Sequence, residues 1–489
     1  MKKVAVIGGG FSGLSAACYM AKEGYEVELF EKNSSLGGRA RQLEINGFRF
    51  DMGPTFYWMP DVFESFFEDF GSTVDENYRL VRLDPGYEIY FGKGGRINIH
   101  KSLDQLIETF EGIEKDSSLF LRKYLRSGAY NYSVAMDKVV YKPGNSMSEL
   151  IMPETIRSAG QFTNTLSAVI RKNIRDSRLR QVLEFSVLFL GAKADRTPSF
   201  YRFMNYADMI LGTWHVMGGM FKVVEAMSAI AQRSGVRIHT GTEVRRIIVN
   251  GKKISAVETA GGITATDIVI STADYRHAEM LLPYSFRSYS DKYWRKKDMA
   301  PSAILFYLAF DKRLKNVNHH TLFFDSDFER HADMIYGKPG YPDDPLFYAS
   351  FPSVTDRSLV PEEKDLGIIL IPLASGIKEN RDIADEYYRK ITDRIKEAAG
   401  QNITDNILFK RTYYPTDFIR DYNAYMGNAY GLANTLFQTA FLKPKVKSRK
   451  LENLFYAGQL TVPGPGVPSA IISGKIASGE ALKYLRKKR

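Results

Sequence analysis

The sequence is almost devoid of cysteine, since Cys18 is the single one among 489 residues. A disulfide framework is thereby excluded, which favours a reducing compartment such as the cytoplasm. No run reaches the roughly 18 to 20 apolar residues of a membrane-spanning helix, and the short basic start is not followed by the cleavage site of a secretory signal. We therefore expect at most a peripheral membrane protein.

Other signatures are missing too. The sequence has no H-x-x-x-H, no cysteine pair and no clustered acids at ligand spacing, so we expect no metal. No G-x-S-x-G or Cys/His signature indicates acyl transfer. Lys and Arg number 67 against 56 Asp and Glu, a net charge of +11. This excess fits an anionic membrane as well as a solvated basic surface, and without a recognisable nucleic-acid module we expect no nucleic acid.

The beginning of the chain carries a pattern for binding a dinucleotide. The apolar run Val4–Ile7 predicts a buried strand, and Gly8, Gly10 and Gly13 then match G-x-G-x-x-G before a predicted helix over 11–22. The first glycine permits a tight turn, the second a close approach of a pyrophosphate, and the third close packing of helix on strand. The phosphates would meet the positive end of the helix.

An acid follows the second predicted strand, "YEVELFEK". Glu31 stands 18 residues after Gly13, where a carboxylate accepts hydrogen bonds from ribose hydroxyls and repels a 2′-phosphate. NADP is therefore disfavoured, while FAD and NAD both remain open from this segment alone.

The next segment, "EKNSSLGGRARQLEINGFRFDMGPTFYW", does not continue with the β-α-β unit of a nicotinamide enzyme. It offers Gly37-Gly38-Arg39 and then Gly53-Pro54. This arrangement resembles the FAD-binding half of the amine oxidase and phytoene desaturase flavoproteins. The resemblance implies that Arg39, which comes after the ribose acid Glu31 in the sequence, reaches the diphosphate. It also implies that Gly53-Pro54 passes beside the flavin.

The end of the chain, "NLFYAGQLTVPGPGVPSAIISGK", strengthens the resemblance. A strand leads to Gly458, and a Pro/Gly turn precedes a helix whose N-terminus can stabilise negative charge on a reduced flavin. Thr461 and "PGPGV" are similar to the C-terminal signature of carotenoid desaturases. Three residues depart from that signature: Gln459, Leu460 and Val462. Between the two ends, residues 235–274 predict a β-meander, and the resemblance implies that the backbone of Val244 meets the adenine.

The resemblance implies an α/β fold in which a Rossmann-like, amine-oxidase-like FAD-binding domain is interleaved with an α+β substrate-binding domain. We expect the FAD-binding domain at 1–75, 215–275 and 450–489, and the substrate-binding, membrane-facing domain at 76–214 and 276–449. The residues expected to bind FAD are Gly8, Gly10, Ser12, Gly13, Glu31, Lys32, Gly38, Arg39, Gly53, Pro54, Val244, Gly458, Gly466 and Val467.

The implied activity is that of a bacterial-type, FAD-only phytoene desaturase. A hydride would pass from an allylic carbon to the flavin, a proton would leave the neighbouring carbon, and repeated desaturation would lead toward lycopene. The implied partners are a hydrophobic polyene, the inner face of the cell membrane, and oxygen or a quinone as electron acceptor. No motif marks the proton acceptor, so the catalytic residues are unknown at this stage.

Three alternatives stay open. The first is another carotenoid enzyme of this fold, either a later-step 3,4-desaturase or an isomerase. The second is an amine oxidase, and the third is a non-enzymatic prenyl chaperone, because Rab escort proteins share the fold. Of the histidines, His215, His319 and His320 are the most open to a functional role, although we expect each to be structural or on the surface.

Overall fold

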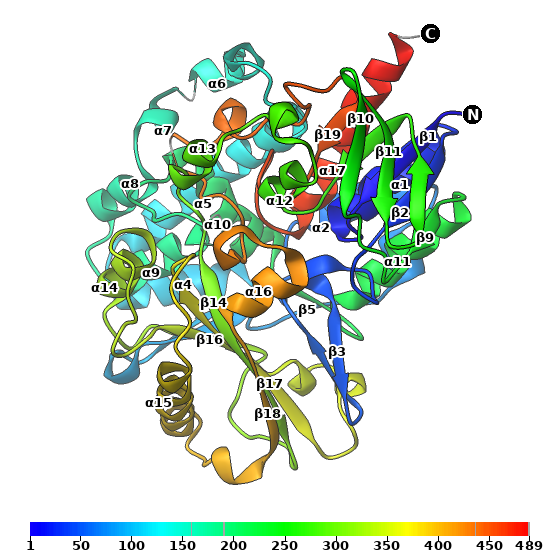
Figure 1. Cartoon of the computed structure of the whole chain (residues 1–489). Coiled ribbons are helices and arrows are strands. Elements are labelled where there is room, and N and C mark those ends of the chain that lie inside the picture. The colour runs from blue at the N-terminus through cyan, green and yellow to red at the C-terminus, as the bar shows by residue number, and fades with distance from the viewer. Residues whose placement is uncertain (158, 189–190, 436, 488–489) are drawn as a thin grey trace.

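The computed structural model describes residues 1–157, 159–188, 191–435 and 437–487 (Figure 1). Segments from both ends and from the middle of the chain form one parallel five-stranded sheet. In Figure 1 the blue, green and red parts of the ribbon meet in this region, near both termini. The strands, in sheet order, are β19 (Leu454–Tyr456), β13 (Ile268–Ser271), β1 (Lys3–Ile7), β2 (Glu26–Phe30) and β9 (Arg237–His239).

Alternation of side chains along β1 explains how this sheet is buried on both faces. Val4 and Val6 pack into a cluster with four helices, while Ala5 and Ile7 pack on the opposite face beneath a three-stranded meander. The helices are α1 (Phe11–Lys22), α2 (Pro60–Asp69), α11 (Phe221–Arg233) and α17 (Val467–Arg486). The meander strands are β10 (Arg246–Asn250), β11 (Lys253–Thr259) and β12 (Gly262–Ala265).

Helices α1 and α17, from opposite ends of the chain, lie in unusually close contact. Ser15 Oγ donates a hydrogen bond to the carbonyl of Ile471 at 2.8 Å. A Cβ built on Gly474 would lie 2.4 Å from the Ser12 carbonyl oxygen and 2.7 Å from Ser15 Cβ. The absence of a side chain at Gly474 therefore sets how closely the two helices approach.

A second, seven-stranded sheet is mostly antiparallel and lies beside the first (Figure 1). Its strands, in sheet order, are β18 (Ile407–Tyr413), β14 (Ser302–Phe310), β17 (Asp365–Leu373), β16 (Phe347–Ser350), β15 (His320–Phe323), β6 (Tyr87–Tyr90) and β7 (Arg96–Ile99). Helix α15 (Arg381–Ala399) packs on one face, and the hairpin of β3 (Gln42–Ile45) and β4 (Phe48–Asp51) packs on the other.

A helical layer contributes a further apolar cluster next to this sheet. Its main helices are α4 (Leu103–Ile113), α5 (Ser117–Val134), α8 (Leu166–Asn173), α9 (Ser177–Phe185), α10 (Phe203–Tyr206) and α14 (Phe328–Tyr336). The remaining short elements are α3 (Val74–Asn77), α6 (Pro153–Arg157), α7 (Ala159–Thr163), α12 (Tyr275–Met280), α13 (Asp291–Arg295), α16 (Pro415–Tyr422), β5 (Leu80–Arg82) and β8 (Trp214–Val216).

The predicted elements around the glycine motif are confirmed, including the helix over 11–22 and the strand before Glu31. Every strand of the five-stranded sheet falls within the segments assigned above to FAD binding, and every strand of the seven-stranded sheet falls within the other two. The division into two domains at those residue numbers stays a prediction.

We expect Gly474→Ala to destabilise the protein by about 1 to 3 kcal/mol, because the new methyl group would push α17 away from α1. Gly479→Ala is the matched control, since a Cβ on Gly479 of the same helix meets nothing within 4 Å. The control should gain up to about 1 kcal/mol from helix propensity. Denaturant unfolding measures both, and equal stabilities of the two variants would contradict the close contact.

Candidate functional site

A cavity of about 590 Å³ opens at the edge of the five-stranded sheet where β1 and β2 end. Ligands of open α/β sheets bind at this carboxyl edge. The cavity is continuous. Its polar end is lined by the glycine loop after β1, and its other end by aromatic and aliphatic side chains of the helical layer.

The glycines of the first loop have the conformations and contacts that their spacing predicts. Gly8 has φ +102°, in the region that favours glycine, and a Cβ on Gly13 would lie 1.9 Å from the Gly8 carbonyl oxygen. A Cβ on Gly38 would lie 3.3 Å from Gly10 Cα, so two glycine-containing loops meet at the cavity wall. Side chains at these positions would clash with neighbouring loop atoms and disturb the shape of the cavity wall.

Two helices point their N-termini into this cavity. The residues before their first turns, Gly10 for α1 and Gly466 for α17, line the cavity and carry no side chain to cap the free N–H groups. Neither first turn, both fully described, contains an acidic residue. Both positive helix ends are therefore available to an anionic ligand.

Glu31 lies at the same edge and is buried, with 5% of its surface exposed. Its Oε2 accepts a hydrogen bond from the Gly9 amide at 2.8 Å, and its Oε1 accepts one from the Asn33 amide at 2.8 Å. These bonds hold the carboxylate against the glycine loop, where the sequence places a ribose acid.

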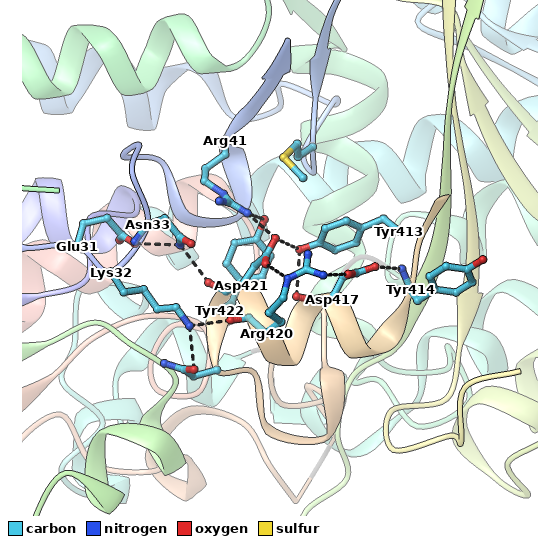
Figure 2. Close-up of polar contacts among 12 residues, drawn as sticks. Glu31, Lys32, Asn33, Arg41, Tyr413, Tyr414, Asp417, Arg420, Asp421 and Tyr422 are labelled. Atoms are coloured by element: carbon cyan, nitrogen blue, oxygen red, sulfur yellow. Dashed lines mark hydrogen bonds and ion pairs between the residues drawn. The ribbon is translucent and has the colours of Figure 1, made fainter. Parts of the chain in front are cut away.

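The loop after Glu31 is fixed by α16, almost 400 residues away in the chain (Figure 2). Lys32 Nζ donates to the carbonyl of Arg420 at 2.7 Å, and Asn33 Nδ2 donates to the carbonyl of Asp421 at 3.0 Å. The Arg41 guanidinium also bonds the Asp421 carboxylate at 2.7 Å. Lys32 lines the cavity, but its ammonium group is already engaged by α16.

Arg39 provides a positive charge in the cavity wall. Its side chain bonds the carbonyl of Asn428 at 3.1 Å and lies over the ring of Tyr422, 5.2 Å from the ring centre. Among the described residues its buried Nε has no hydrogen-bond partner and its guanidinium no ion pair, and burial lowers its pKa. A guanidinium without an ion pair, in the wall of the same cavity as two helix N-termini, fits a diphosphate.

All predicted cofactor residues except Gly13 line this cavity, from Gly8 and Ser12 through Pro54 and Val244 to Val467. Gly13 lies behind the wall, in the packing position that its place in the motif requires. The structure thus brings the predicted residues together, while their contacts with FAD stay predictions.

Sequence reasoning missed Thr272 and Asp274, which line the same cavity. They follow β13, the neighbour of β1 in the sheet, so their place at the carboxyl edge follows from the topology. The available signal was "STAD" directly after the predicted strand "DIVIS".

The far end of the cavity has a different chemistry. Its wall is formed mainly by rings and aliphatic chains, including Phe56, Trp58, Phe185, Phe200, Leu322 and Phe324. Such a surface stabilises an apolar ligand by burial and offers few hydrogen bonds to a polar one. Among the residues that the structure describes, no group of three His, Cys, Asp or Glu side chains could hold a metal ion.

Comparisons with known proteins agree with this geometry. Residues 11–482 match the family described as flavin containing amine oxidoreductase. The carotenoid 3,4-desaturase of Haloarcula japonica is 38% identical, covering 96% of each chain. The 4,4′-diapophytoene desaturase (4,4′-diaponeurosporene-forming) of Staphylococcus aureus strain Newman is 31% identical, covering 99% of each chain.

Solved structures share the fold at low identity. An oxidoreductase from Methanosarcina mazei has a TM-score of 0.64 at 19% identity, covering 97% of this chain and 99% of that one. Cyclohexylamine oxidase from Brevibacterium oxydans has a TM-score of 0.60 at 14% identity, with full coverage of both chains. The predicted fold class and FAD as the cofactor are confirmed. The chain therefore belongs to the flavin-containing amine oxidoreductases and, within them, to the FAD-dependent carotenoid desaturases, which are oxidoreductases acting on CH–CH bonds.

Proposed function

We propose that the protein dehydrogenates a long acyclic carotenoid, taking phytoene toward lycopene. The observation that carries this proposal is the continuity of the cavity, in which a cradle for an anionic cofactor opens directly into an apolar chamber. A hydrocarbon has no polar group to recognise, so its binding depends on buried surface, at about 25 cal/mol per Å². The rings of Phe56 and Phe185 in the chamber wall would orient the chain.

We also propose how the residues of the polar end hold FAD. The glycine loop and the N-terminus of α1 receive the diphosphate together with Arg39, and Glu31 accepts hydrogen bonds from the ribose. The backbone of Val244 contacts the adenine, and Gly466 and Val467 at the start of α17 face the flavin ring. When bound, FAD supplies the two-electron acceptor. The surrounding apolar wall keeps water away from the reacting carbon atoms.

A second candidate is desaturation at a later step. The Haloarcula japonica relative, whose name gives 3,4-desaturation, is 38% identical, compared with 31% for the Staphylococcus aureus enzyme. Both activities remove two hydrogens from adjacent carbons of a polyene, so the same cavity serves either. The difference is how far along the cavity the chain end reaches.

The mouth of the cavity supports membrane docking. Exposed Lys142 and Ser146 line the cavity, and Lys445 Nζ bonds the carbonyls of Gly144 and Phe441, so two segments meet there. Four exposed apolar residues, which we call the mouth patch, belong to these segments: Met147, Ile151, Phe437 and Leu442.

We propose that the mouth patch enters an anionic bilayer and admits the polyene from it, at the inner face of the cell membrane. Exposed Lys138 and Lys142, which precede Met147 in the chain, suit anionic headgroups, as does the net charge of +11. Among the described residues, no helix is both long and apolar enough to cross a bilayer. The electrons would then pass to oxygen or to a quinone.

The proposed activity is tested by incubating the FAD-loaded protein with liposomes that contain either phytoene or lycopene. The reaction is followed by polyene absorbance and pigment composition. We expect phytoene to be converted to products with a longer conjugated system. Conversion of lycopene alone would replace the first candidate with the later-step one, and failure with both would refute C40 desaturation. Parallel liposomes with 4,4′-diapophytoene test whether the cavity prefers a shorter chain.

We expect Glu31→Gln to raise the dissociation constant of FAD by about 10- to 100-fold, because one charge-assisted hydrogen bond to the ribose would become a neutral one. Titration of the apo-protein with FAD, followed by flavin fluorescence, measures this constant. Glu44→Gln, an exposed change on β3, is the control and should leave the constant unchanged. Equal affinities of the two variants would remove Glu31 from the FAD site.

We expect Phe437→Ser to weaken binding to anionic liposomes by about tenfold or more, since the phenylalanine would bury its ring in the bilayer. Ile263→Ser is the control, because Ile263 is similarly exposed, at 67% against 82%, but lies on β12 of the meander. Sedimentation with liposomes measures the binding. Loss of binding in the control, or none in Phe437→Ser, would place the membrane face elsewhere.

A further inference from the structure

Three of the seven histidines form one buried row, although the sequence suggested only separate structural or surface residues. The ring centres of His215 and His319 are 4.6 Å apart, and those of His319 and His320 are 4.3 Å apart. All three side chains are buried, with at most 6% of their surface exposed. The row joins β8 to the start of β15, so two distant segments build it.

One end of the histidine row contacts a carboxylate. His215 Nε2 lies 3.2 Å from Asp356 Oδ2, and Asp356 is fully buried. Burial opposes its ionisation, but hydrogen bonds from His215, the Gly218 amide and Ser358 outweigh burial and hold the pKa of Asp356 well below its usual range. This end of the row therefore carries a fixed negative charge.

The other end of the row reaches the cavity. His320 Nδ1 lies 2.6 Å from the hydroxyl of Tyr348, and Tyr348 lines the cavity. The same hydroxyl lies 2.7 Å from Thr55 Oγ1, and Thr55 directly follows Pro54, where the polar and apolar ends of the cavity meet. The ring of Phe56 stacks on His320 at 4.2 Å between centres.

The protonation states favour proton donation from Tyr348 to His320. Burial holds the pKa of His320 and that of His319 well below the usual value, so both imidazoles are neutral at rest. In the neutral tautomer that carries its proton on Nε2, His320 can accept at Nδ1 the hydroxyl proton of Tyr348, and the Tyr348 oxygen can accept in turn from Thr55. His320 Nε2 is buried and has no hydrogen-bond partner among the described residues. A buried imidazole with one unpartnered nitrogen, bonded to a tyrosine of the cavity wall, requires an explanation beyond packing.

We propose that Tyr348 takes the proton that the polyene loses and passes its own hydroxyl proton to His320 Nδ1. This inference rests on the proposed desaturation. One C–H bond of the substrate would break as its hydrogen leaves with both bonding electrons, as a hydride, for which bound FAD would be the acceptor. The neighbouring C–H bond breaks heterolytically, its electrons form the new C=C bond, and its proton bonds to the Tyr348 oxygen as the old O–H bond breaks.

A weak base suffices for this step. Departure of a hydride leaves positive charge on carbon, and a C–H bond next to a carbocation is strongly acidic. Position in the cavity therefore matters more than basicity. The Asp356 carboxylate, two rings beyond His320, favours a positive charge on the row once the proton has arrived.

The test compares Tyr348→Phe, His320→Gln and the control Tyr124→Phe in anaerobic single turnovers with substrate in liposomes. Tyr124 is a buried tyrosine of the helical layer whose hydroxyl bonds Asn205, so its variant reports the loss of a buried hydroxyl alone. We expect Tyr348→Phe to slow product formation by about 10²-fold or more at unchanged FAD content. His320→Gln should behave similarly, because an amide accepts the hydrogen bond but not the proton.

Substrate deuterated at the carbon that loses the proton distinguishes a role of Tyr348 in proton transfer from a structural effect of the substitution. In Tyr348→Phe proton loss becomes the slow step, so the isotope effect at that carbon should exceed that of the wild type. A slower variant with an unchanged isotope effect, or a variant as fast as the control, would overturn the inference while leaving desaturation intact. A wild type that converts no carotenoid would instead refute the proposed function.

Discussion

The contact between α1 and α17 is the constraint on which the site depends. The two helices come from opposite ends of the chain, yet Gly474 packs on the Ser12 carbonyl and Ser15 bonds the Ile471 carbonyl. This contact brings two positive helix ends to one cavity. Because helix-end electrostatics fall off within about one turn, a wider separation would divide the cofactor site into two weak anion sites.

Residues 53–56 connect the polar end of the cavity to its apolar end. Gly53 lies against Arg39, where a Cβ would come within 2.3 Å of the Arg39 carbonyl oxygen, while Phe56, three residues later, stacks on His320. Thr55 stands between them and contacts Tyr348. The register of this segment therefore fixes where the cofactor end stops and where the hydrocarbon end begins.

The sequence predicted those elements whose structure depends on neighbouring residues in the chain. The glycine loop, the helix over 11–22 and the helix after Gly466 follow from backbone conformation and spacing. The pairing of Arg41 with Asp421 spans 380 residues. The row of His215, His319 and His320 likewise depends on how β8 and β15 are placed. Neither leaves a periodic signal, because the partners lie on separate elements that only the tertiary fold brings together.

A hydrocarbon site limits which group can serve as a base. An ionised carboxylate in such surroundings loses its hydration, and the size of that effect is visible at Asp208, whose pKa is raised by burial to about 7. A tyrosine hydrogen-bonded to a neutral imidazole adds no charge to the resting cavity and so does not oppose the entrance of a polyene. The negative charge that would stabilise the transferred proton stands at Asp356, separated from the cavity by the histidine row. Because the Asp356 carboxylate lies away from the cavity, the wall can stay apolar for the polyene while a negative charge still stabilises the transferred proton.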